Sequence, residues 1–244
     1  PRFQYEEHIS ALVRDRIWPD STRAISELRL VIEFKSASGW NRMFSSGKLA
    51  IDIVDYPGEW LLDLPLPNLP GPHQIQNAGA ALMALRHLGK DEAACEAAVT
   101  RAEWPARMQR LRHGPLVDLA PGVELWLDGG HNPAGGEAVA ATLARMPARP
   151  THLICGMLNT KDVTGYMRPL ASHVKQLHAV SIPGEKNTLP AEETRDAALS
   201  AGIAAVTAAS VAEALAEIAA KSPEARVLIC GSLYLAGSIL RENG

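Results

Sequence analysis

The second half of the chain predicts an α/β fold built on a Rossmann-like parallel sheet. From residue 125 onward, short apolar runs alternate with longer stretches of helical periodicity. Val211, Leu215 and Ile218 show this periodicity, because they fall on one face of a helix. Strands that alternate with helices pair in parallel through right-handed crossovers, so we expect one sheet covered by helices.

The elements of this half follow one another with short joins. A strand over residues 125–128 leads through Gly129 and Gly130 into a helix over residues 136–146. The further strands, each followed by a helix, are predicted over residues 151–155, 177–182, 204–207 and 226–230, with the helices over residues 163–173, 191–201, 211–221 and 234–242.

The first half of the chain is less regular. Helices are predicted over residues 73–88 and 91–101, and short strands between residues 30 and 60. A loop-like stretch follows the second helix, and we place a domain boundary there. The predicted domains are residues 1–110 and residues 111–244.

The amino-acid composition limits which kinds of partner and which cellular compartment are expected. The chain has 244 residues, a hydrophobic share of 47% and a formal net charge of −3, which describes a globular protein with no electrostatic case for nucleic acid. No apolar run is long enough to span a bilayer, so no membrane partner is expected. The widely spaced cysteines Cys95, Cys155 and Cys230 favour buried thiols over a disulfide framework or a zinc cluster. We therefore expect a cytoplasmic protein.

A carboxylate and an imidazole follow the first predicted strand of the sheet. Asp128 ends the strand, and His131 comes directly after the turn at Gly129 and Gly130. Ligands of open α/β sheets collect at this end of the strands, where an acidic group can bind ribose hydroxyls and an imidazole can orient an anionic substrate. The alternative is a turn in which Asp128 only accepts hydrogen bonds from nearby amides.

Two other candidate sites lie upstream of this turn. His73 and Asn77 are four residues apart and share a helix face, and an amide such as Asn77 can bind a nucleobase or a phosphate. Arg107 lies in a short loop between the predicted domains, where a guanidinium suits a phosphate. A polar helix start and a solvated surface arginine are the plain alternatives.

Two polar positions follow later strands of the sheet. Ser232 lies between the last strand and the last helix, a natural anion site, although capping of the helix alone would explain a serine there. Lys161-Asp162 could equally be a solvated helix start. The sequence contains no G-x-x-x-x-G-K-[ST] phosphate loop, no G-x-G-x-x-G, no G-x-S-x-G and no H-E-x-x-H motif.

Taken in order, several strings resemble the folylpolyglutamate synthase/dihydrofolate synthase family of the Mur ligase superfamily. The strings are Leu64-Pro65-Leu66-Pro67, Gly71-Pro72-His73-Gln74 with Asn77-Ala78, Pro105-Ala106-Arg107-Met108-Gln109, Leu127-Asp128-Gly129-Gly130-His131-Asn132-Pro133, Gly156 with Lys161-Asp162, and Gly231-Ser232-Leu233-Tyr234-Leu235-Ala236-Gly237. The resemblance implies that the end of a Mur-ligase-type central ATPase domain precedes the Rossmann-like domain.

The same resemblance implies an ATP-dependent amide ligase with ATP and Mg²⁺ as cofactors. Dihydropteroate or a folate would form an acyl phosphate, and the amine of L-glutamate would attack it. By resemblance, Asn77 would contact the adenine side of ATP, Arg107 its phosphates, and Asp128 the nucleotide. His131 and Ser232 would be the catalytic residues that hold the glutamate or the acyl phosphate.

The chain departs from the family in several places. The family's phosphate loop, magnesium ligands and pterin-binding loop lie upstream of anything in this sequence, so no metal ligand is assigned here. We expect a monomeric C-terminal portion of a ligase that alone does not turn over ATP. Residues 1–35 match the family poorly, and Ala106 and Gly130 stand where glycine and alanine are usual.

Two other functions stay open at this point. A Mur-type ligase of cell-wall precursor synthesis has a similar turn at residues 128–133, although the strings His73-Gln74 and Ser232-Leu233-Tyr234 favour the folate branch. The third possibility is a nucleotide- or glutamate-binding module without catalysis.

Overall fold

The chain divides into two compact units. The computed structural model describes residues 26–33, 48–55, 66 and 68–243. One unit comprises residues 1–64 and 78–91, and the other comprises residues 65–77 and 92–244.

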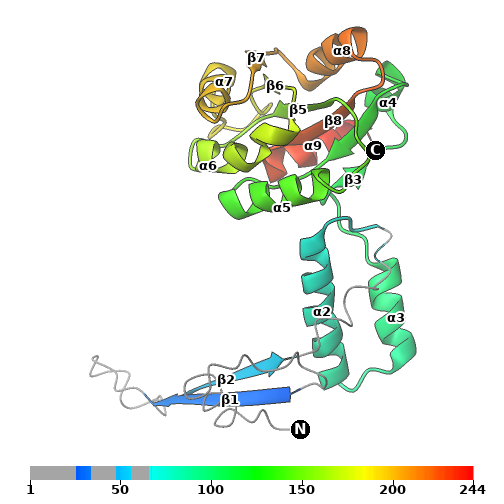
Figure 1. The fold of residues 1–244 in the computed structure, drawn as a ribbon, viewed down its shortest axis with the longest axis vertical. Coiled ribbons are helices and arrows are strands. Elements are labelled where there is room, and N and C mark those ends of the chain that lie inside the picture. Colours follow the sequence, from blue (N-terminus) through cyan, green and yellow to red (C-terminus); the bar gives the residue numbers. More distant parts are fainter. Residues whose placement is uncertain (1–25, 34–47, 56–65, 67, 244) are drawn as a thin grey trace, which may run out of the picture. The chain divides into compact units, whose positions relative to one another are not determined.

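The described part of the first unit contains a pair of antiparallel strands. Strand β1, Ser26–Glu33, pairs with β2, Lys48–Asp55 (Figure 1). This pair confirms that strands occur between residues 30 and 60. Helix α2, Pro72–His87, begins in the second unit and ends in the first, and Gly89 follows its end with a left-handed φ of 71°.

The second unit is built on a six-stranded sheet in the order β3-β4-β8-β5-β6-β7 (Figure 1). The short edge strand β3 runs antiparallel to β4, and the remaining neighbours pair in parallel, which confirms the predicted fold class. The strands are β3, Gln109–Arg110; β4, Glu124–Leu127; β5, Thr151–Cys155; β6, Gln176–Ala179; β7, Ala205–Thr207; and β8, Arg226–Cys230.

Helices pack on both faces of this sheet and enclose two apolar clusters. The helices that contribute to one cluster are α4, Pro115–Leu119; α8, Val211–Lys221; and α9, Leu233–Asn243. The helices that contribute to the other are α5, Pro133–Leu143; α6, Val163–Met167; and α7, Ala191–Ser200. Every residue of β5 and β8 is buried, as expected of parallel strands covered on both faces. Helix α3 spans Glu92–Arg101, and no helix in the described part of the chain is long and apolar enough to cross a membrane.

Several details differ from the prediction, two of them for a clear local reason. Helix α5 begins earlier than predicted, at Pro133, because the Asn132 side chain caps it by accepting the Gly135 N–H at 2.8 Å. The helix predicted over residues 163–173 changes from α6 to a 3₁₀ helix, Arg168–His173, where Pro169 cannot donate a backbone N–H. Strand β3 and helix α4 had not been predicted.

The cysteines are buried and free, as predicted. Cys155 and Cys230 are register partners at the ends of β5 and β8. Their position matters for the site, because the loops that follow β5 and β8 begin directly after these two cysteines.

Two buried histidines lie on the neighbouring strands β5 and β6. His152 on β5 is 4% exposed and His178 on β6 is 2% exposed, with their ring centroids 6.3 Å apart. Burial lowers the pKa of His152 to about 4, and the charges of His178 and Lys175 add to this effect. Burial also lowers the pKa of His178, although Glu217, 3.8 Å from its Nε2 atom, opposes that shift.

These histidines predict a loss of stability in mild acid. A histidine whose pKa is depressed by folding binds its proton more readily in the unfolded chain, so the stability is full above pH 6.5 and falls toward pH 4. For His152 the loss is up to about 3 kcal/mol over that range. Urea unfolding at several pH values measures it. His152→Gln should flatten the pH dependence. Equal slopes in this variant and the wild type would contradict the assignment.

Candidate functional site

The turn after β4 is held by one buried carboxylate. Asp128 is 5% exposed, and its two oxygens accept the backbone N–H groups of Met108 at 2.8 Å and Gly130 at 2.7 Å. Burial raises the pKa of Asp128, and these two amides together with the charge of Arg107 oppose that rise. Asp128 therefore joins the loop before β3 to the turn after β4, which is the amide-binding alternative considered from the sequence.

The loop that carries Arg107 has an unusual backbone. Its neighbours Ala106 and Met108 have φ values of 56° and 45°, in the left-handed region where L-residues are disfavoured. Two bonds hold this conformation: the N–H of Ala106 donates to Gln109 Oε1 at 2.9 Å, and its carbonyl accepts the N–H of Gly129 at 2.8 Å. Strain of this kind is retained where surrounding contacts fix it, and it often marks a functional loop.

Arg107 itself is half-buried within this loop. Among the residues that the structure describes, no carboxylate lies within ion-pair distance of its guanidinium. Its positive charge acts on both Asp128 and His73. A guanidinium held in place without a carboxylate partner is well suited to bind a phosphate.

The start of α2 contributes His73, for which a polar helix start was the plain alternative. Burial lowers the pKa of His73, Asp128 opposes that effect, and Arg107 adds to it. The Nδ1 atom of His73 is buried and has no hydrogen-bond partner. Asn77, in contrast, is exposed and donates its side-chain N–H to Gln74 at 3.0 Å.

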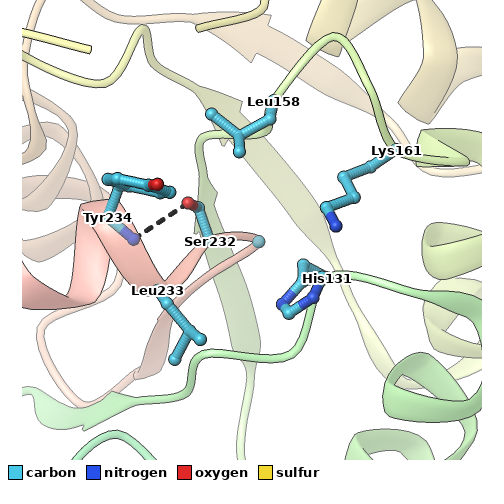
Figure 2. Close-up of a pocket in the computed structure, with 7 residues that line it drawn as sticks. His131, Leu158, Lys161, Ser232, Leu233 and Tyr234 are labelled. Atoms are coloured by element: carbon cyan, nitrogen blue, oxygen red, sulfur yellow. Dashed lines mark hydrogen bonds between the residues drawn. The ribbon is translucent and has the colours of Figure 1, made fainter. Parts of the chain in front are cut away.

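His131 and Ser232 lie together at a hollow of about 180 Å³ (Figure 2). The residues that line it come from the turn after β4, the loop after β5 and the start of α9: His131, Leu158, Lys161, Gly231, Ser232, Leu233 and Tyr234. These segments all follow the carboxyl ends of parallel strands, where α/β sheets bind their ligands.

Each polar group of the hollow has a defined setting. The Nδ1 atom of His131 lies 2.9 Å from the carbonyl oxygen of Gly129. Ser232 is 2% exposed, and its hydroxyl accepts the N–H of Tyr234 at 3.0 Å. Figure 2 shows the ammonium group of Lys161 pointing toward His131. An imidazole, a hydroxyl and a cation in one small hollow suit a ligand that carries a carboxylate.

Gly231 allows the backbone to turn between β8 and α9 beside this hollow. Its φ is 103°, and a Cβ atom there would lie 2.7 Å from both the Cys155 sulfur and the Gly156 carbonyl oxygen. A larger residue would be strained and would also collide with the loop after β5. Glycine at this position therefore places Ser232 at the strand end.

The structure brings together some of the predicted site residues and separates others. His131 and Ser232 share the hollow, and Asp128 is bonded to the loop that carries Arg107. Asn77 is not among the residues that line the hollow. Lys161-Asp162 was a candidate loop position after a strand end, with a solvated helix start as the alternative, and no site role was assigned to Lys161. Asp162 does cap α6 by accepting the N–H of Gly165 at 2.9 Å, while Lys161 lines the hollow.

Two family models match different parts of the chain. Residues 106–233 match the model described as Mur ligase, glutamate ligase domain. Residues 1–70 match the YcjX-like family, DUF463. The segment that resembles the folate ligases poorly lies within this second match. The assignment of residues 1–110 to a central ATPase domain remains a prediction.

Curated relatives repeat this division. The chain is 27% identical to folylpolyglutamate synthase of Lacticaseibacillus casei over 82% of this chain and 43% of that protein. It is 33% identical to UDP-N-acetylmuramoylalanine–D-glutamate ligase of Sphingopyxis alaskensis over 63% of this chain and 33% of the relative. It is 50% identical to the Ras-like GTPase YcjX of Escherichia coli over 68 residues, 27% of this chain and 15% of that protein. The chain thus spans less than half the length of each of these relatives.

Solved structures resemble the chain at the level of the fold and the sequence. E. coli FolC in complex with DHPP and ADP matches with a TM-score of 0.61 and 27% identity, over 74% of this chain and 40% of that one. Mycobacterium tuberculosis folylpolyglutamate synthase complexed with ADP and AMPPCP matches with a TM-score of 0.63 and 25% identity, over 97% of this chain and 52% of that one.

Proposed function

We propose, from the premise that this chain belongs to the Mur ligase family through its glutamate ligase domain, that it provides the glutamate-binding part of an ATP-dependent folate–glutamate ligase. The observation that carries the proposal is the hollow in which His131, Lys161 and Ser232 meet (Figure 2). The folate branch is supported by the similarity to folylpolyglutamate synthase over most of the chain.

The proposed reaction joins the amine of L-glutamate to a carboxylate of dihydropteroate or a folate. The carboxylate first takes the terminal phosphoryl group of ATP, which gives an acyl phosphate and ADP. The amine then attacks the acyl carbon, the C–N bond forms, and phosphate leaves. Such a reaction depends on positioning and charge neutralisation, because the charge on the transferred phosphoryl group must be stabilised.

The residues near the loop before β3 would act on the nucleotide. The guanidinium of Arg107 would bind the phosphates of ATP, since it is fixed in its loop without a carboxylate partner among the described residues. Asp128 would act by holding this loop in place, and a direct contact of Asp128 or Asn77 with the nucleotide remains a prediction.

The residues of the hollow would act on glutamate. The ammonium of Lys161 would bind a carboxylate of the amino acid, and the hydroxyl of Ser232 would donate a hydrogen bond to it while accepting the N–H of Tyr234. Leu158, Leu233 and Tyr234 would cover the apolar part of the side chain. His131 would face the amine.

The 244 residues by themselves would not turn over ATP, because their sequence contains no phosphate loop. A free nucleotide-binding module would instead be stabilised by ATP alone. A thermal unfolding scan with and without Mg²⁺-ATP separates these functions, and we expect no stabilisation. We also expect a monomer in the cytoplasm.

Catalysis can be tested in a fusion that restores the missing part of a ligase. In this fusion ligase, residues 65–244 follow the L. casei folylpolyglutamate synthase up to its position aligned with residue 64 of this chain. We expect incorporation of labelled L-glutamate into a folate that depends on ATP. A fusion that hydrolyses ATP but never transfers glutamate to a folate would contradict the proposal.

The similarity to UDP-N-acetylmuramoylalanine–D-glutamate ligase supports a second candidate, a ligase of cell-wall precursor synthesis. Both reactions use glutamate as the amine, so the same hollow serves either one. The two differ in the acid and in the enantiomer of glutamate. In the fusion ligase the L. casei part binds the acid, so transfer of L-glutamate rather than D-glutamate to a folate distinguishes the two candidates at the hollow that this chain supplies.

Replacement of Ser232 by Ala tests the glutamate site. The hydroxyl touches the proposed ligand but adds little core volume, so we expect the KM for glutamate to rise roughly tenfold, equivalent to one lost hydrogen bond, with kcat nearly unchanged. Ser238, on α9, is a matched control, because it is buried like Ser232 but donates its hydroxyl hydrogen to the Leu235 carbonyl. An unchanged KM in Ser232→Ala, or an equal change in Ser238→Ala, would count against this role.

A further inference from the structure

We propose that His131 is the base that accepts a proton from the ammonium group of the incoming glutamate. This role rests on the function proposed above and adds a chemical step to it. Three observations support the step: the hydrogen bond made by one ring nitrogen, the place of the ring in the hollow, and the chemistry of the other residues there.

A backbone carbonyl fixes the tautomer of His131. The Nδ1 atom lies 2.9 Å from the carbonyl oxygen of Gly129. A carbonyl oxygen can only accept a hydrogen bond, so Nδ1 must carry the hydrogen. In the neutral ring the lone pair is then on Nε2. Gly129 is itself held, because its N–H donates to the Ala106 carbonyl at 2.8 Å.

The proposed nucleophile needs such a base. An amino acid carries its amine largely as an ammonium group near neutral pH, and an ammonium group has no lone pair with which to attack an acyl carbon. A proton must therefore leave before or during the attack. General bases that act in this way contribute typically 10²–10⁴-fold to the rate, by an order-of-magnitude estimate.

The other residues that line the hollow offer no comparable acceptor. Lys161 carries an ammonium group, which has donors only. The hydroxyl of Ser232 already accepts the N–H of Tyr234, and a hydroxyl is a weak base. The phenol oxygen of Tyr234 is likewise a weak base, and Leu158, Leu233 and Gly231 have no basic side chain. Among the seven lining residues, His131 is therefore the one whose side chain offers a nitrogen lone pair, on Nε2 of the neutral ring, with no hydrogen bond to it within the described structure.

The step balances as follows. The ammonium group gives one proton to Nε2 of His131, which becomes an imidazolium, and the freed lone pair forms the C–N bond. The C–O bond to the phosphoryl group breaks, and its electron pair leaves with the phosphate. The second proton of the amine passes to the departing phosphate, and the imidazolium returns its proton to solvent.

The tautomer and the contact can be measured on the chain itself. Long-range ¹H–¹⁵N spectra of the labelled protein, with His131→Gln for assignment, should show hydrogen on Nδ1 and none on Nε2 in the neutral ring. L-Glutamate should shift the Nε2 resonance, whereas glutarate, which lacks the amine, should shift Lys161 without moving Nε2. Hydrogen on Nε2, or an equal response to both ligands, would overturn the proposal. If neither ligand perturbs Lys161 or Ser232, the proposed glutamate site itself fails.

The catalytic step can be tested with two nucleophiles in the fusion ligase. Hydroxylamine is largely uncharged near neutral pH, so it needs no base and converts an acyl phosphate to a hydroxamate. We expect His131→Gln to lose glutamate transfer by roughly 100-fold while it keeps hydroxamate formation within about threefold. His113→Gln, a control at an exposed position, should keep both. Loss of both reactions in His131→Gln, or retention of glutamate transfer, would overturn the role, whereas no ATP-dependent hydroxamate in the wild type would instead count against the proposed ligase.

Discussion

Replacing Arg107 by Ala is expected to lower kcat/KM for ATP in the fusion ligase roughly 100-fold or more, the size seen when one donor to a developing charge is lost. The guanidinium is half-buried, lies between two residues with left-handed backbone, and has no carboxylate partner among the residues described. Its removal takes away a charge from the phosphates and leaves the apolar core intact. The melting temperature should therefore stay close to that of the wild type.

Two control variants sharpen this experiment. Arg107→Lys keeps the charge but not the planar, two-pronged donor, so it should recover only part of the activity. Arg145→Ala removes an exposed guanidinium near the end of α5 and should have no effect. Wild-type turnover by Arg107→Ala would refute the assignment. A large drop in melting temperature would show that the arginine mainly supports its loop.

The largest effect on stability is expected from Glu124→Ala. The two carboxylate oxygens of Glu124 bind Arg110 at 2.7 Å and Arg226 at 2.9 Å, and Arg226 is only 3% exposed. Burial alone would raise the pKa of Glu124, but Arg226 and then Arg110 outweigh it, so the pKa is lowered. Removal of the carboxylate leaves a buried guanidinium without its counter-charge, which costs about 3–5 kcal/mol.

Urea unfolding near neutral pH measures this loss directly. Asp196→Ala is the matched control, because Asp196 pairs with Arg195 at 2.7 Å but the carboxylate side chain is 62% exposed. An exposed pair of this kind contributes less than about 1 kcal/mol. A loss below about 1 kcal/mol for Glu124→Ala would contradict the view that Arg226 depends on this carboxylate.

The sequence predicted the sheet because each parallel strand has a regular apolar pattern. The alternation of strands and helices after residue 125 identified the fold class, and the rule that ligands collect at strand ends singled out His131 and Ser232. Both residues indeed line one hollow. Gly231 has a φ of 103°, and this left-handed backbone sets the direction in which the chain leaves β8 at that strand end.

Other features could not be found from local patterns. Strand β3 has two residues and thus no period to detect. The partners of Asp128 are backbone amides, one of them twenty positions away at Met108, so only the fold shows that this carboxylate holds the Arg107 loop. The sequence left Lys161 open between a loop position of the site and a solvated helix start. Asp162 beside it does cap α6, and only the direction of the lysine side chain shows that Lys161 lines the hollow.

Equilibrium dialysis of the chain with labelled L-glutamate tests whether the hollow at the three strand ends binds the amino acid. We predict saturable binding of one glutamate per chain in the millimolar range, about 4 kcal/mol, weakened roughly tenfold or more in Lys161→Ala. Lys175→Ala, at an exposed lysine next to the start of β6, should bind like the wild type. Failure of the wild-type chain to bind glutamate saturably, or equal binding by the Lys161→Ala variant, would contradict the account.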